Sequence, residues 1–296
     1  MIKTLFLGSN WEAVESLKNL KNDDRFEIVG VITQPDKPIG RKQILTPSLV
    51  KQYCIKNDIK VFFTENNPEK YKEALDLFKP ELIVCKAFGE MIPGFFLEYP
   101  KYKAINIHFS ILPKYRGAVP IQMAILNGEK ETGITFVQMV ENMDAGPILK
   151  IIKKKIKETD TNQSLRERLV EISSKELPTV LIDWVNGKIQ PTVQYESQAS
   201  YCYKKDIEKE KAEIKFNQME AEYIERMVRA FIPWPVAWTV INGKRCKIFE
   251  TQVVENGLEN KKRMVFKTKK GLIEILKLQP EGKREMSVNE YLRGKE

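Results

Sequence analysis

The chain has 296 residues, of which 42% are hydrophobic and 30% charged, and its formal net charge is +9 at pH 7. This composition is typical of a soluble globular protein with room for one large domain or two ordinary ones. The sequence has no apolar stretch long enough to span a bilayer, and residues 1–8 are predicted to form a strand and its turn rather than a signal peptide. We therefore expect a cytoplasmic protein and exclude an integral membrane protein.

The cysteines and the single histidine restrict the chemistry of the site. The four cysteines lie far apart and form no Cys-x-x-Cys pair, which indicates a reduced compartment rather than a disulfide framework. One histidine and four scattered cysteines do not make the ligand set of a zinc site. We therefore expect no metal.

The N-terminal segment predicts a parallel sheet. Its predicted elements are a buried strand (3–7), a turn (8–10), a helix (11–20) and a second strand (26–33). Asn10 is placed to cap the helix. Strand, glycine turn, helix and strand in this order form a βαβ unit, whose two strands run parallel. The turn lacks the Gly-x-Gly-x-x-Gly pattern, so a dinucleotide site has little support.

A long polar connection follows at residues 34–47. Several of its positions are proline or glycine, and it carries the basic residues Lys37, Arg41 and Lys42. Such a segment predicts a mobile basic surface loop. The next predicted elements are a helix (47–56), a short strand (60–63), a helix (69–78) and a strand (82–85).

The polar residues best suited to catalysis lie in the middle of the chain. Residues 105–108 alternate apolar and polar, so in a strand the side chains of Asn106 and His108 share one face. The elements predicted next are a helix (118–126) and a strand (134–140). That strand runs into Asp144-Ala145-Gly146, and a carboxylate beyond a strand end is placed to reach the end of a neighbouring strand.

An amide, an imidazole and a carboxylate indicate a short list of reactions. Asn106 can donate a hydrogen bond to a developing oxyanion, His108 can donate or carry a proton, and Asp144 can orient the histidine. Acyl transfer to a neutral nucleophile needs these three catalytic functions. The alternative is structural, with hydrogen-bonded core residues at 106 and 108 and a turn residue at 144. Spacing supports the two interpretations about equally.

The segments that follow look structural. Residues 148–155 alternate weakly, as a strand does, and residues 160–185 are amphipathic, as a helix is, with Pro178 predicted as a break. Residues 187–202 contain a proline and mixed polar side chains, which predicts a linker.

A second domain is predicted near residue 203. A helix at 221–231 ends at Pro233-Trp234-Pro235, and several short alternating segments with turns then predict a small β-barrel. Trp234 and Trp238 are predicted to lie in its core, because large aromatic side chains dominate small cores, and the alternative is that they stack on bases.

The positive charge is concentrated in this second domain. Residues 200–296 hold 21 Lys and Arg against 15 Asp and Glu, which accounts for +6 of the net charge. A run of three consecutive basic residues, Lys261-Lys262-Arg263, is continued by further lysines. The asymmetry indicates a phosphate-rich partner, and the alternative for the short run is a solvated lysine-rich face.

These motifs together resemble a known family. The run NIHFSILPKYRGAVPIQMAILNGEKETGITFVQMVENMDAG (106–146) resembles the signature of the folate-dependent formyltransferases, in which Asn-x-His, a Ser-Leu-Leu-Pro-like loop and a downstream Asp-x-Gly form the site. Three further stretches resemble the branch of this family that acts on methionyl-tRNA. They are TQPDKPIGR (33–41), RAFIPWP (229–235) and LQPEGKREM (278–286). The resemblance covers nearly the whole chain.

The resemblance implies an α/β fold with two domains. Residues 1–188 would form a Rossmann-like, mostly parallel sheet domain with the catalytic site, residues 189–202 a linker, and residues 203–296 an OB-like β-barrel that binds tRNA. The implied activity is transfer of the formyl group of 10-formyltetrahydrofolate to the α-amino group of initiator methionyl-tRNA, for translation initiation. The implied partners of a monomeric enzyme are this tRNA and the folate.

The resemblance also implies roles for particular residues. The catalytic residues would be Asn106, His108 and Asp144. The folate contacts would be Ser110, Ile111, Leu112, Pro113, Phe88, Gly89 and Ile92. The tRNA contacts would be Arg41, Lys42, Lys37, Lys261, Lys262 and Arg263.

The chain departs from the family pattern at three places. Lys86 and Phe109 stand where small residues are expected, and the Gly8-Ser9-Asn10 turn is closer to the branch that acts on glycinamide ribonucleotide. Two alternatives stay open. One is a sugar-nucleotide N-formyltransferase, and the other is an RNA-binding protein with a decayed formyltransferase domain.

Overall fold

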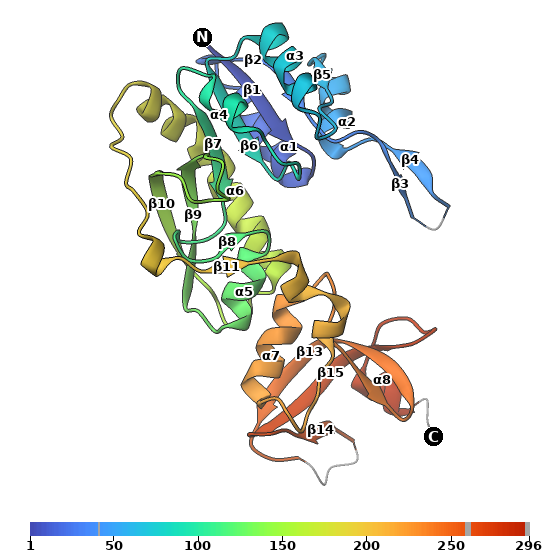
Figure 1. The fold of residues 1–296 in the computed structure, drawn as a ribbon. Helices are drawn as coiled ribbons and strands as arrows, with labels where there is room; N and C mark the ends of the chain where they lie inside the picture. The colour runs from blue at the N-terminus through green and yellow to red at the C-terminus, as the bar shows by residue number, and fades with distance from the viewer. Residues whose placement is uncertain (41, 258–261, 294–296) are drawn as a thin grey trace. The chain divides into compact units, whose positions relative to one another are not determined.

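The computed structural model describes residues 1–40, 42–257 and 262–293, and the chain divides into two compact units (Figure 1). The first unit comprises residues 1–116, 133–153 and 168–200. The second comprises residues 117–132, 154–167 and 201–296. The domain boundaries at 188 and 203 stay a prediction.

A mostly parallel sheet forms the centre of the first unit (Figure 1). Among the described residues it has seven strands in the order β10-β9-β7-β6-β1-β2-β5. The strands are β1 (Ile2–Gly8), β2 (Phe26–Ile32), β5 (Val61–Phe62), β6 (Leu82–Lys86), β7 (Ala104–His108), β9 (Glu131–Gln138) and β10 (Ile148–Lys155). Strands β5, β2, β1, β6 and β7 pair in parallel, whereas β9 pairs antiparallel with β7. The predicted Rossmann-like sheet is confirmed.

Three of the helices that belong to this unit begin at a capping side chain. The helices of the unit are α1 (Trp11–Lys21), α2 (Leu49–Lys56), α3 (Pro68–Phe78), α4 (Gly94–Glu98) and α6 (Asn162–Val185), the last of which begins in the second unit. Asn10, Ser48 and Asn67 accept backbone N–H groups at the starts of the first three helices. In the part of the chain that the structure describes, no helix is both long and apolar enough to cross a membrane.

The structure corrects two predictions, one for the connection at residues 34–47 and one for the helix that contains Pro178. The polar connection after β2 contains a hairpin of β3 (Lys37–Ile39) and β4 (Ile44–Thr46), because residues on the two sides pair in antiparallel register around Gly40, which has a φ of 73°. Figure 1 shows this hairpin extending away from the sheet of its unit.

Pro178 lies inside α6 and does not break it. The buried neighbours Leu177 and Leu181 pack that turn, which offsets the missing N–H group of the proline.

An antiparallel sheet forms most of the second unit. Among the described residues it has five strands, β12 (Trp238–Ile241), β13 (Lys244–Val254), β14 (Met264–Lys267), β15 (Leu272–Pro280) and β16 (Met286–Ser287). The unit also contains α5 (Pro120–Leu126), α7 (Ala221–Ala230) and α8 (Val288–Arg293). Short elements complete the chain: β8 (Arg116–Gly117), β11 (Tyr201–Cys202), η1 (Glu196–Gln198), η2 (Lys204–Ile207) and η3 (Lys209–Ala212). The short strands predicted after the helix at 221–231 are confirmed as an antiparallel sheet, and the closed barrel stays a prediction.

Trp234 does not lie in the core of the second unit. The sequence predicts both Trp234 and Trp238 there, but Trp234 is 49% exposed. Trp238 is half-buried, and the guanidinium carbon of Arg245 lies 3.9 Å from its ring centroid. The core is already filled by smaller side chains of α7 and the sheet, such as Ile224 and Ile248, so the Pro-Trp-Pro turn leaves its indole at the surface.

Candidate active site

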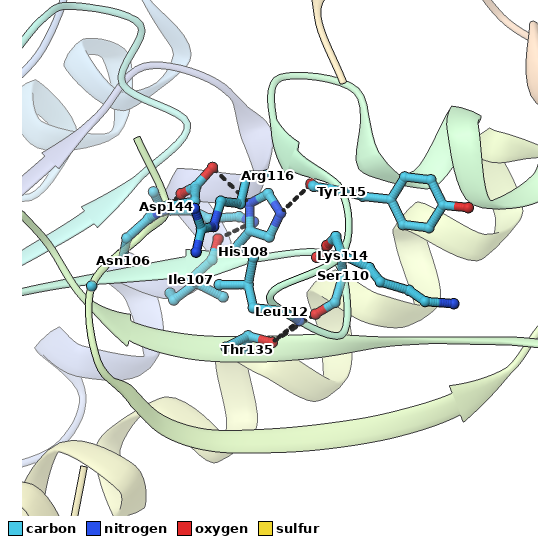
Figure 2. A network of polar contacts seen from close by, with 12 residues as sticks. Asn106, Ile107, His108, Ser110, Leu112, Lys114, Tyr115, Arg116, Thr135 and Asp144 are labelled. Atoms are coloured by element: carbon cyan, nitrogen blue, oxygen red, sulfur yellow. Dashed lines mark hydrogen bonds and ion pairs between the residues drawn. The ribbon is translucent and has the colours of Figure 1, made fainter. Parts of the chain in front are cut away.

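Three side chains from two segments meet at the carboxyl end of β7. Asn106 and His108 extend from this strand, and Asp144 lies in the connection between β9 and β10. Asn106 Nδ2 donates to Asp144 Oδ1 at 3.1 Å, and His108 Nδ1 lies 3.3 Å from Asp144 Oδ2. One carboxylate therefore holds both the amide and the imidazole, as Figure 2 shows. The structure brings together all three residues that the sequence predicts as catalytic.

The backbone around Asp144 explains the Asp-x-Gly spacing. Asp144 has a φ of 52°, a left-handed conformation that aspartate tolerates better than most residues. Two residues later the chain passes back against the end of β9, and a Cβ added to Gly146 would lie 1.9 Å from the Gln138 carbonyl oxygen. Glycine at 146 is therefore needed to bring the carboxylate of Asp144 back to β7.

The hydrogen bonds of His108 define its protonation. Its Nε2 lies 2.8 Å from the Tyr115 carbonyl oxygen, which can only accept, so Nε2 carries a hydrogen. The Nδ1 side faces the Asp144 carboxylate, so one further proton can be shared between ring and carboxylate. Burial lowers the pKa of His108 below its ordinary value, against the opposing effects of Asp144 and the Tyr115 carbonyl. A neutral imidazole held this way is ready to accept a proton and to release it again.

A hydrogen-bond network that the sequence did not predict holds the backbone of the loop that carries Asp144. Gln194 Nε2 donates to the carbonyl oxygens of Asp144 and Gly146, each at 2.7 Å. Arg116 is 1% exposed, and it donates to Gln194 Oε1 at 3.1 Å and to Glu196 Oε2 at 2.7 Å. Gln194 lies in the segment predicted as a linker, where no local pattern marks it as important.

A second support fixes the loop after His108. Ser110 is fully buried, and its hydroxyl donates to the Lys114 carbonyl at 2.6 Å. Thr135 of β9 donates to the Ser110 carbonyl at 2.6 Å and accepts from the Leu112 N–H at 3.3 Å (Figure 2). These bonds set the turn that presents the Tyr115 carbonyl to His108.

A cavity of about 250 Å³ is lined by two of the three residues, Asn106 and Asp144, whereas His108 is not part of its lining. Its lining combines the apolar side chains of Met91, Ile92 and Leu97 with Asn106, Asp144 and the chain from residue 137 to residue 143. Apolar walls with a few converging polar groups are typical of a site for a small organic molecule. Among the described residues, no group of three or more His, Cys, Asp and Glu is placed to hold a metal ion.

The other residues predicted to bind folate have different positions. Within the described chain, Ile92 is part of the cavity lining, whereas Phe88, Gly89 and residues 110–113 are not. Phe88 is 3% exposed, and the Gly89 carbonyl accepts from Gln34 Nε2 at 3.3 Å. Their roles in folate binding stay a prediction.

The residues predicted to bind tRNA are spread over both units. Lys37 and Lys42 are exposed on the β3–β4 hairpin, and Lys262 is exposed next to β14. Arg263 donates from Nε to Glu274 Oε1 at 2.8 Å, so its charge is already paired within the protein. Arg41 and Lys261 lie outside the described residues.

Comparison with known proteins places this chain in a family. A family model described as formyl transferase matches residues 2–181, and one described as formyl transferase, C-terminal domain, matches residues 206–296. The chain belongs to the formyl transferase family, which confirms the family predicted from the motifs. It is 37% identical over 309 residues to the methionyl-tRNA formyltransferase of Pediococcus pentosaceus, covering 99% of this chain and 94% of that protein.

Two solved structures share the fold. The N-formyltransferase from Helicobacter canadensis, in complex with folinic acid and dTDP-3-aminofucose, is 24% identical with a TM-score of 0.70, covering 95% of this chain and 100% of that chain. HypX from Aquifex aeolicus, in complex with tetrahydrofolic acid, is 19% identical with a TM-score of 0.63. This chain is matched over 98% of its length and spans about half, 47%, of HypX.

Proposed function

We propose that the protein transfers the formyl group of 10-formyltetrahydrofolate to the α-amino group of initiator methionyl-tRNA, as a monomer in the cytoplasm. The observation that carries this proposal is the single carboxylate of Asp144 that holds both Asn106 and His108 beside a cavity of about 250 Å³. The identity to the Pediococcus pentosaceus enzyme, which extends over both units, supports methionyl-tRNA as the acceptor.

The cavity fits a folate as donor. Its apolar wall at Met91, Ile92 and Leu97 can pack against a flat ring, and the backbone of residues 137–143 offers hydrogen-bonding groups to the ring edge. The formyl group of a folate held there would lie near Asn106. The Asn106 amide has a second N–H besides the one given to Asp144, and this N–H can be donated to the formyl oxygen.

The reaction needs an oxyanion donor and a proton carrier. An α-amine has a pKa of roughly 7.7–8.0, so an appreciable part is neutral near pH 7 and attacks the formyl carbon without a strong base. The new N–C bond leaves an oxyanion, which Asn106 stabilises, and a surplus proton on the amine nitrogen. The His108–Asp144 pair takes this proton, directly or through water, and delivers it to the folate nitrogen as its bond to carbon breaks.

The proposal is tested by supplying acceptors in parallel. Purified protein is incubated with 10-formyltetrahydrofolate and either charged initiator methionyl-tRNA, uncharged tRNA or an amino-sugar nucleotide, and products are identified by mass. We expect formylmethionine from the charged tRNA alone. A formylated sugar without formylmethionine would identify a sugar-nucleotide N-formyltransferase. Tight tRNA binding without any product would identify an RNA-binding protein with an inactive enzyme domain.

We further propose that a basic cavity in the second unit contacts the tRNA. It has a volume of about 530 Å³, and two of the motifs noted in the sequence converge on it, at Trp234 and at Glu281. Its cationic lining residues are Lys209, Arg245 and Lys247. Three cations against one carboxylate suit a phosphate backbone, and the exposed indole of Trp234 suits an unstacked base.

Neutralising this cavity should weaken tRNA binding in a salt-dependent way. In the Arg245→Gln/Lys247→Gln variant we expect the KM for tRNA to rise with little change in kcat. Log affinity decreases with log salt concentration, and the magnitude of this negative slope should become smaller by roughly 0.7–0.9 for each phosphate group that the variant no longer neutralises. The control is Lys175→Gln, which removes an exposed, ion-paired lysine of the first unit. An unchanged slope in the double variant would show that the cavity does not contact the tRNA.

A further inference from the structure

An ion pair is buried beneath the candidate site. Lys86, the last residue of β6, and Glu12, in the first turn of α1, are each 4% exposed, and Lys86 Nζ lies 3.4 Å from Glu12 Oε2. Lysine and glutamate are almost never this buried unless they are paired. Removing both charges from water costs more than their attraction commonly returns, so such a pair calls for a reason beyond stability.

The path of the chain brings the two residues together. Gly8 ends β1 beside Lys86, and a Cβ added to Gly8 would lie 2.8 Å from the Lys86 carbonyl oxygen and 2.4 Å from Ala13 Cβ. Because glycine allows this close approach, α1 begins directly against the end of β6. The carboxylate of Glu12, one residue before Ala13, then reaches the ammonium of Lys86.

The Lys86 ammonium touches both neighbours of His108. It donates to the Ile107 carbonyl at 3.1 Å, and it lies 3.1 Å from the centroid of the Phe109 ring. An ammonium has three hydrogens to donate, and these contacts together with Glu12 supply a carbonyl, an aromatic face and a carboxylate. Lys86 and Phe109, which both stand where small residues are expected, are therefore in contact with each other. Phe109 is 4% exposed, and its ring packs against the Lys86 ammonium.

We propose that Lys86 and Glu12 are positioning residues for His108: the ammonium holds the Ile107 carbonyl on one side of the histidine and the Phe109 ring on the other, and the carboxylate keeps that ammonium in place. The consequence for catalysis rests on the proposed formyl transfer. A histidine that moves by about 1 Å loses its alignment with the reacting atoms, and such misplacement can cost about 10²-fold in rate.

The charge of Lys86 also acts on the titration of His108. Burial lowers the pKa of His108, the Asp144 carboxylate and the Tyr115 carbonyl raise it, and the charge of Lys86 lowers it. Removing the Lys86 charge should therefore raise the pKa of His108. If the Lys86 charge did not act on the imidazole, the titration would stay where it is.

The test compares Lys86→Met, Glu12→Gln and the double variant. Each single variant leaves one buried charge without its partner, so we expect a lower Tm. The double variant replaces both with neutral side chains of similar volume, and its Tm should return towards that of the unmodified protein. We expect kcat of the double variant to stay about 10- to 100-fold lower with the KM of the folate donor nearly unchanged. Recovery of kcat together with Tm would overturn the proposal.

A second measurement does not depend on enzymatic activity. His108 is the only histidine, so NMR of untagged protein labelled in histidine gives one imidazole titration. We expect a pKa below 6.5 in the unmodified protein and a higher one in the double variant. An unchanged titration would overturn the proposal even if formyl transfer itself were not observed. The matched control is the exposed pair on α6, as Glu171→Gln/Lys175→Met, which should alter neither readout.

Discussion

Alanine at Asn106 or at His108 is expected to lower the turnover number for formyl transfer by about 10²–10³-fold, the usual cost of removing one oxyanion or proton-transfer group. Asn106 supplies the free N–H beside the cavity, and His108 supplies the ring that shares a proton with Asp144. Single-turnover formylation of methionyl-tRNA measures this loss directly, because it separates the chemical step from product release.

The two variants should differ in pH dependence. Asn106→Ala keeps the His108–Asp144 pair, so its rate is expected to fall uniformly across the pH range. His108→Ala removes the titrating ring, so the part of the profile due to its lowered pKa should disappear. Circular dichroism and tRNA affinity serve as controls and should stay near those of the unmodified protein. Unchanged turnover in either variant would show that the substituted residue is not catalytic.

Arg116→Ala is expected to lower the free energy of unfolding by about 2–4 kcal/mol, because it opens a cavity and breaks buried hydrogen bonds. The Arg116 side chain is among the largest that are fully buried in the described chain. Its loss leaves Gln194 without the group that orients its amide oxygen. Denaturant unfolding measures the effect. The control is Arg25→Ala, at an exposed arginine paired with Asp23, which should change stability by no more than about 0.5 kcal/mol.

The same substitution should also reduce activity through Gln194. If Arg116 acts on Asp144 through this glutamine, then Gln194→Leu is expected to reproduce the loss of turnover with a smaller loss of stability. Gln194 holds the carbonyl oxygens of Asp144 and Gly146, and a loop freed from both bonds no longer fixes the carboxylate between Asn106 and His108. Full activity in Gln194→Leu would show that the network is structural only.

The sequence predicted the sheet and the three central site residues because both depend on local pattern. Alternation in residues 105–108 places Asn106 and His108 on one face whatever lies around them, and β7 has that form. The βαβ order at the N-terminus dictates parallel pairing of β1 and β2, which the structure has. The motif spacing added the family, and this chain belongs to it.

The failures of prediction arise where long-range contacts outweigh local preference. Pro178 disfavours helix locally, but packing on both sides carries α6 through it. Trp234 is apolar enough for a core, yet smaller side chains from distant segments already fill that core. The Gly8-Ser9-Asn10 turn showed only a departure from family pattern, whereas the structure reveals a close approach between β1 and β6 at Gly8.

For this protein, then, local order in the chain was sufficient to predict the type of the main elements, the family and the placement of Asn106 and His108 in one strand. The tertiary structure decided which distant groups act on them. Gln194 reaches Asp144 from 50 residues away, and Glu12 in the first turn of α1 reaches Lys86 at the end of β6. Such contacts depend on how separate elements pack in space, and buried polar groups must find partners wherever that packing places them.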